Sequence, residues 1–161
     1  MARSTFVSFH YERDCWRVQQ VLRMGAIEGQ EILPAQEWES VKQQGKQAIE
    51  DWIENQMKYK AAVVVLIGAQ TAARPWVKYE IAKAWNDRRP LVGVWIHGLK
   101  DSSGSTDTVG ANPFEKVTLD NGGSVADHVP VHTPFGSDSN QVYDSIKNNL
   151  ESWVVNAYKR S

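Results

Sequence analysis

Residues 61–85 read AAVVVLIGAQTAARPWVKYEIAKAW, and this stretch decides the fold. Its first part, residues 61–68, is a continuous valine-rich run, which is typical of a strand buried on both faces at the centre of a parallel sheet. Pro75 has no backbone N–H to lose at a first helical position, so the sequence predicts that a helix begins there. Apolar residues then recur at helical spacing and predict the packed face of that helix, at Val77, Ile81 and Ala84.

Further elements are predicted on both sides of this stretch. Short β-branched and aromatic runs predict two more strands, at residues 5–9 and 90–97. Helical periodicity predicts three more helices, at about residues 14–24, 45–59 and 142–157. Asp14 is expected to cap the first of these helices, and Gly25 to end it.

Two segments lack a clear period. Residues 26–40 are interrupted by Pro34 and predict a functional or mobile loop. Residues 98–140 are rich in Gly, Ser, Asp and Thr, and predict a long ordered excursion with one short strand near residues 116–119. The length of 161 residues favours a single domain that includes this excursion.

The alternation of strands and helices indicates the class of fold. Strands that alternate with helices form a parallel sheet covered on both faces by right-handed crossovers. We therefore expect an α/β protein with a flavodoxin-like three-layer sandwich.

Composition narrows the classes of partner. The net charge of −1 argues against a nucleic-acid partner. The longest apolar run is far shorter than the roughly 20 residues that span a bilayer, so no membrane partner is expected. One cysteine, Cys15, cannot form an internal disulfide and is interpreted as a small buried hydrophobic residue. With no segment resembling a signal peptide, these features predict a cytoplasmic protein.

The sequence lacks the motifs of several kinds of site that are common in such sandwiches. The turn after the first strand reads FHYERD, without the glycines of a dinucleotide fingerprint or the phosphate loop of a flavodoxin. No Walker A loop and no nucleophile elbow occurs. The four histidines lack paired ligand spacing, so no metal site is predicted.

What remains is a set of residues at the carboxyl ends of the predicted strands, which meet at one crevice in an open parallel sheet. They are Phe9, His10, Tyr11, Trp76, Glu80 and His97. Aromatic rings with one carboxylate suit a ligand that carries adenine or nicotinamide. Glu80 alone would be interpreted as a surface residue, and Trp76 fits core packing as well as stacking on a ligand.

Four sequence blocks resemble a known family. Residues 4–14 read STFVSFHYERD, which resembles the opening strand of Toll/interleukin-1 receptor (TIR) domains, and residues 76–80 read WVKYE, which matches the W-x-x-x-E motif of enzymatic TIR domains. With VGVWIHGLKD at 92–101 and GANPF at 110–114, the chain resembles the bacterial TIR-like ThsB proteins of the Thoeris anti-phage system.

The resemblance implies cleavage of NAD as substrate, with no separate cofactor, and synthesis of a cyclic ADP-ribose isomer or an ADP-ribose conjugate on phage infection. It further implies an effector protein activated by this signal, a phage-derived trigger and a homo-oligomer as partners. Glu80 would be the catalytic carboxylate. The resemblance places the following residues around the substrate: Phe9, His10, Tyr11, Asp14, Trp76, Asn112 and Phe114.

A single carboxylate agrees with this reaction, because nicotinamide leaves as a neutral molecule and needs no general acid. Two alternatives stay open. The first is a non-catalytic TIR-like interaction or sensor module, and the second is an enzyme similar to nucleoside deoxyribosyltransferases.

Overall fold

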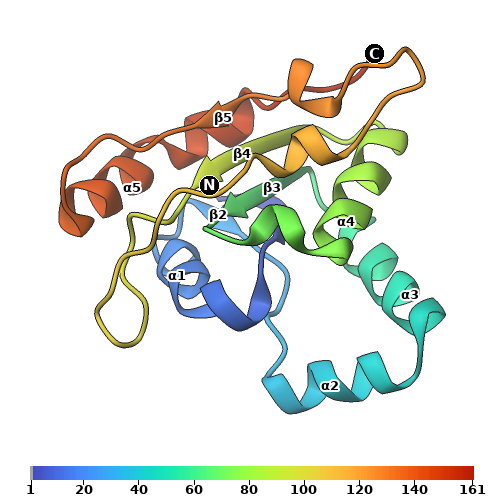
Figure 1. The fold of residues 1–161 in the computed structure, drawn as a ribbon, viewed down its shortest axis with the longest axis horizontal. Coiled ribbons are helices and arrows are strands. Elements are labelled where there is room, and N and C mark those ends of the chain that lie inside the picture. The colour runs from blue at the N-terminus through green and yellow to red at the C-terminus, as the bar shows by residue number, and fades with distance from the viewer. Residues whose placement is uncertain (1) are drawn as a thin grey trace.

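The protein is a three-layer α/β sandwich around a five-stranded parallel sheet (Figure 1). The computed structural model describes residues 2–161. All strand pairs are parallel, and the strand order is β2-β1-β3-β4-β5. This confirms the predicted flavodoxin-like fold. The strands are β1 Arg3–Ser8, β2 Ile27–Glu28, β3 Ala62–Ile67, β4 Leu91–Trp95 and β5 Val131–His132.

The helices cover both faces of the sheet (Figure 1). The α-helices are α1 Tyr11–Arg23, α2 Ala35–Gln43, α3 Lys46–Met57, α4 Pro75–Asn86 and α5 Ser139–Val155. Three short 3₁₀ segments accompany them, η1 Thr71–Ala73, η2 Pro113–Lys116 and η3 Val125–Asp127. One core layer packs α1 and α5 against the sheet, and the other packs α3, α4, η2 and η3 against the opposite face.

The central strand explains why one stretch decides this arrangement. All six residues of β3 are buried. Side chains alternate across a strand, so Val63 and Val65 enter the core layer under α3 and α4, while Val64 and Leu66 enter the layer under α1 and α5. Helix α4 begins at Pro75 as predicted. Its carboxylate, Glu80, is therefore delivered to the carboxyl end of the sheet.

The start of α1 differs from the prediction. The helix begins at Tyr11, and its N-cap is His10, whose Nδ1 accepts a hydrogen bond from the backbone N–H of Arg13 at 3.1 Å. Asp14 lies inside the helix, fully buried, and is not the cap. The neutral imidazole nitrogen supplies the acceptor that was expected from the Asp14 carboxylate. Cys15 is only half-buried, although a buried residue was expected. Gly25 follows the end of the helix at φ +77°, as expected.

The two segments without a clear period also differ in detail. Residues 26–40 contain β2 and the first part of α2, so they are not one irregular loop. Pro34 is the N-cap of α2 and so precedes that helix without interrupting it. No strand forms at residues 116–119, where η2 ends and Thr118 makes only an isolated bridge to Ser124. The strand supplied by the excursion is β5, which is too short to show a period of two.

Candidate active site

Glu80 lies on the inner face of α4 and is only 9% exposed. Its Oε1 atom accepts a hydrogen bond of 2.6 Å from the hydroxyl of Ser8, the last residue of β1. Burial raises the pKa of Glu80 to about 8, while the Ser8 hydroxyl opposes this shift by stabilising the charged form. A pKa of about 8 keeps this carboxyl group mostly protonated at neutral pH.

An open cleft lies over Glu80. Its walls are largely aromatic, because Phe9, Tyr11, Trp38 and Trp52 all line it. Residues 30–33 line it on the side of β2, and Val7 of β1 also contributes. The cleft thus combines one buried carboxyl group with four aromatic side chains, a combination suited to a ligand with flat rings.

The segment that closes the cleft on the side of β2 is fixed by side-chain hydrogen bonds. The amide of Gln30 bonds to both backbone groups of Val7, donating to the carbonyl and accepting from the N–H, each at 2.8 Å. The Tyr11 hydroxyl donates to the carbonyl of Leu33. Gln30 continues the pairing of the sheet after the two residues of β2 have ended.

Two predicted site residues, Phe9 and Tyr11, therefore lie with Glu80 in one cleft. The structure also adds Gln30, Trp38 and Trp52, which sequence reasoning did not assign to the site. Trp38 and Trp52 were interpreted as packing residues, and their rings do pack together, with ring centres 5.5 Å apart. For Gln30 the available signal was the long connection at residues 26–40 between two predicted helices, since such connections often carry functional residues.

His10 and Trp76 do not line this cleft. His10 is 7% exposed and caps α1, and burial lowers its pKa. Trp76 packs its ring edge-to-face on Tyr79, with ring centres 5.3 Å apart. Trp76 is also partly buried against the core layer under α3 and α4. The packing interpretation of Trp76 therefore agrees with the structure.

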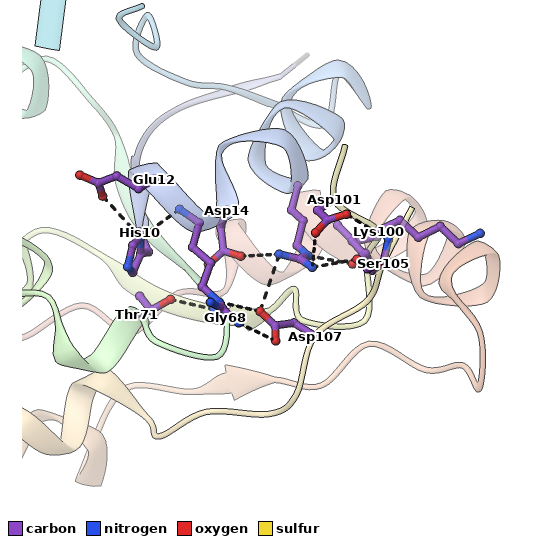
Figure 2. Close-up of polar contacts among 12 residues, drawn as sticks. His10, Glu12, Asp14, Gly68, Thr71, Lys100, Asp101, Ser105 and Asp107 are labelled. Carbon is purple, nitrogen blue, oxygen red and sulfur yellow. Dashed lines mark hydrogen bonds and ion pairs between the residues drawn. The ribbon is translucent and has the colours of Figure 1, made fainter. Parts of the chain in front are cut away.

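Asp14 belongs to a polar cluster that brings α1 together with the segments that follow β3 and β4 (Figure 2). Its carboxylate pairs with Arg17 at 2.9 Å, and Arg17 also donates to the backbone carbonyls of Leu99 and Ser105. Burial raises the pKa of Asp14, and Arg17 opposes the shift. The Oδ2 atom of Asp14 lies so close to Gly68 that a Cβ there would stand 2.2 Å away. Asp14 therefore packs closely against Gly68, which follows β3, and is not among the residues that line the cleft.

Asn112 and Phe114 also lie away from the cleft that they were expected to close. Asn112 caps η2, with its Oδ1 atom accepting from the N–H of Phe114 at 2.9 Å. Phe114 is completely buried and packs against Gly93 of β4, where a Cβ would come within 2.7 Å of its ring. Burying the phenyl ring in the core stabilises the fold more than exposing it at a ligand site would. His97 lines a different hollow, beside Asp107.

Two other properties bear on the site. Within residues 2–161, no group of three or more His, Cys, Asp or Glu side chains is arranged to hold a metal ion. In the same described range, no helix is both long and apolar enough to cross a membrane.

Two comparisons with known proteins indicate the family of the chain. The family model described as "Thoeris protein ThsB, TIR-like domain" matches residues 6–101, which include the whole lining of the Glu80 cleft. A curated relative from Bacillus cereus (strain MSX-D12), named "Putative cyclic ADP-D-ribose synthase ThsB1", is 32% identical over 125 residues. The alignment covers 71% of this chain and 62% of the relative, so the chain matches less than two thirds of that protein's length.

Proposed function

Since this chain belongs to the family of Thoeris ThsB TIR-like domains, we propose that it cleaves the nicotinamide–ribose bond of NAD and makes a nucleotide signal. The proposed product is a cyclic ADP-ribose isomer or an ADP-ribose conjugate. The observation that carries the proposal is the buried carboxyl group of Glu80 beneath an aromatic cleft. The name of the Bacillus cereus relative supports the same reaction class.

Bond cleavage requires stabilisation of positive charge on the ribose. The C–N bond to nicotinamide breaks with both electrons going to the ring nitrogen, so nicotinamide leaves neutral and the ribose becomes an oxocarbenium-like cation. A carboxylate of Glu80 beside this cation lowers the barrier electrostatically, and no residue needs to protonate the leaving group. The nucleophile then forms the new bond to the ribose carbon and, where it carries a proton, releases it.

The burial of Glu80 strengthens that effect. Water is largely excluded around the carboxyl group, so its interaction with a nearby cation is much stronger than at the surface. NAD brings a positively charged pyridinium ring, which favours the ionised form of Glu80 and offsets the desolvation that raises its pKa. The Ser8 hydroxyl already donates to Oε1 and stabilises the same charged form.

The aromatic walls supply orientation. Phe9, Tyr11, Trp38 and Trp52 offer apolar faces on which the nicotinamide or adenine ring can rest. Cyclisation demands that a ring nitrogen of the same molecule reach the ribose before water does, and apolar walls reduce access of water. In this proposal the signal is made on phage infection and activates a separate effector protein.

The test is nucleotide analysis of infected cells. Cells that carry the wild-type protein, Glu80→Gln or the control Glu151→Gln are infected, and small molecules are measured by mass spectrometry. The glutamine keeps the size of the side chain and can still accept the Ser8 hydrogen bond, but it carries no charge. We expect a new ADP-ribose derivative in wild type and in the control, which changes an exposed glutamate of α5, and none in Glu80→Gln. Defence that persists without any such product would favour the interaction module instead.

A further inference from the structure

Three charged side chains from different parts of the sequence meet beside the cleft. Glu12 lies in the first turn of α1, Lys42 in the last turn of α2, and Arg74 immediately before α4. Arg74 Nη2 is 3.1 Å from Glu12 Oε2, and Lys42 Nζ is 3.8 Å from Glu12 Oε1. Each oxygen of one carboxylate therefore faces a different cation.

The cluster borders the wall of the Glu80 cleft. Glu12 directly follows Tyr11, whose side chain lines the cleft. The Lys42 ammonium lies 6.0 Å from the ring centre of Trp38, another lining residue. Arg74 is the N-cap of α4, the helix that carries Glu80. Both cations thus stand next to elements that shape the cleft.

These side chains are accessible to a ligand. Arg74 is 41% exposed, Lys42 is 30% exposed and Glu12 is 48% exposed. Ion pairs at this exposure contribute little to folding, because water and salt screen them. Burial opposes the ionisation of Glu12, but its backbone N–H and the charges of Arg74 and Lys42 outweigh this and lower its pKa. Glu12 is therefore an anion at neutral pH, held between two cations that a stronger anion could take over.

We propose that Arg74 and Lys42 form a binding site for the diphosphate of a nucleotide, and that Glu12 occupies this site while it is empty. The inference rests on the proposed function, since the diphosphate of NAD lies one ribose away from the bond that Glu80 would help to break. A guanidinium binds phosphate oxygens in pairs, and an ammonium adds a mobile point charge. Lys42 also pairs with Glu39 at 2.6 Å, so a ligand competes with two carboxylates for it.

The arrangement predicts effects of opposite sign within one cluster. Loss of either cation removes an attraction for the diphosphate and weakens binding. Loss of the Glu12 charge removes a competitor and strengthens binding. If the three residues served only to hold α1, α2 and α4 together, all three changes would act in the same direction, because each would break the same ion pairs.

The experiment is isothermal titration of the full chain with ADP-ribose, inorganic pyrophosphate and adenosine. The variants are Arg74→Met, Lys42→Met and Glu12→Gln, with Lys78→Met as the control, since Lys78 is an exposed lysine one turn into α4. We expect Arg74→Met and Lys42→Met each to bind ADP-ribose about 10- to 150-fold more weakly, as for loss of a charged hydrogen bond. Glu12→Gln should bind it several-fold more tightly. The control should match wild type, and adenosine should bind all five proteins equally.

The pyrophosphate titration shows whether the site binds a diphosphate alone or only a whole nucleotide. Parallel losses for pyrophosphate and ADP-ribose support a site that the diphosphate alone can fill, and a loss for ADP-ribose only supports a site that requires the whole nucleotide. Unchanged ADP-ribose affinity in Arg74→Met and Lys42→Met overturns the inference. Weaker binding in Glu12→Gln, or no binding of ADP-ribose by wild type, overturns it as well. None of these titrations needs turnover, so they are decided separately from the Glu80→Gln nucleotide analysis.

Discussion

Replacement of Glu80 by glutamine should change how the stability of the protein depends on pH. In the unfolded chain this carboxyl group ionises near its ordinary pKa of 4.5, while in the folded protein burial raises the pKa to about 8. Between these values the folded protein holds a proton that the unfolded chain has lost. The free energy of unfolding of wild type therefore falls as pH rises from about 4.5 to about 8, and the Gln variant lacks this contribution.

The size of the effect follows from the two pKa values. Each pKa unit corresponds to about 1.4 kcal/mol, so the full contribution approaches roughly 5 kcal/mol in alkaline solution. Measurements that start at pH 5 miss part of this contribution, because in the unfolded chain the carboxyl group is already largely ionised at that pH. Between pH 5 and pH 8, wild type should lose about 3 to 4 kcal/mol relative to Glu80→Gln.

Other groups titrate in the same pH range, but their contributions to stability cancel when wild type is compared with Glu80→Gln. Burial lowers the pKa values of His10, His97 and His132, so each of these residues adds stability as pH rises towards 6.5. These contributions are the same in wild type and in Glu80→Gln. The quantity to measure is therefore the difference between the two proteins at each pH, and not the slope of either one alone.

The assay is urea denaturation followed by tryptophan fluorescence at pH 5, 6, 7 and 8, which the seven tryptophans make sensitive. The control is Glu151→Gln, which removes an exposed carboxylate of α5 that is remote from Glu80 in the sequence. A constant difference between wild type and Glu80→Gln over this range would refute the reasoning. It would mean that Glu80 ionises in the folded protein as readily as in the unfolded chain.

Three further predictions concern residues around the site and the core. Ser8→Ala removes the donor to Glu80, so the pKa of Glu80 should rise further, and carboxyl ¹³C NMR titration measures the shift. Gln30→Leu leaves the N–H and carbonyl of Val7 unpaired, which should lower the free energy of unfolding by about 2 to 4 kcal/mol and speed hydrogen exchange at that amide. Gly93→Ala places a methyl group 2.7 Å from the buried phenyl ring of η2 and should cost about 1 to 3 kcal/mol in urea denaturation.

The elements that sequence predicts well are those with long uninterrupted patterns. The run at residues 61–68 became β3, the proline-initiated helix became α4, and the C-terminal periodicity became α5. In each of these, many side chains contribute to one packed face, so the pattern survives single exceptions. Strands β2 and β5 have two residues each, and their positions are set by pairing with β1 and β4, which no local pattern encodes.

The site was predictable to the extent that its residues follow strand ends directly. Phe9 and Tyr11 follow β1, and Glu80 follows β3 within one helix, so all three reach the carboxyl edge. Trp38 and Trp52 arrive from α2 and α3, and nothing in their sequence neighbourhoods separates a lining tryptophan from a packing one. Phe114 was expected at the cleft because the resemblance places it there. In the structure it lies in the core, in space that is available because Gly93 has no side chain.

The hydrogen bonds of Gln30 also protect the sheet from unwanted association. An edge strand normally offers a row of unpaired backbone groups to which another chain can add. Beyond the two residues of β2, the groups of Val7 are already occupied by a side-chain amide. The main chain after β2 no longer pairs with β1 at this point. Even so, a strand of another molecule could not pair with Val7, because both of its backbone groups are already bonded to Gln30. The segment after Gln30 is thereby free to follow a path of its own, and that path forms one side of the cleft.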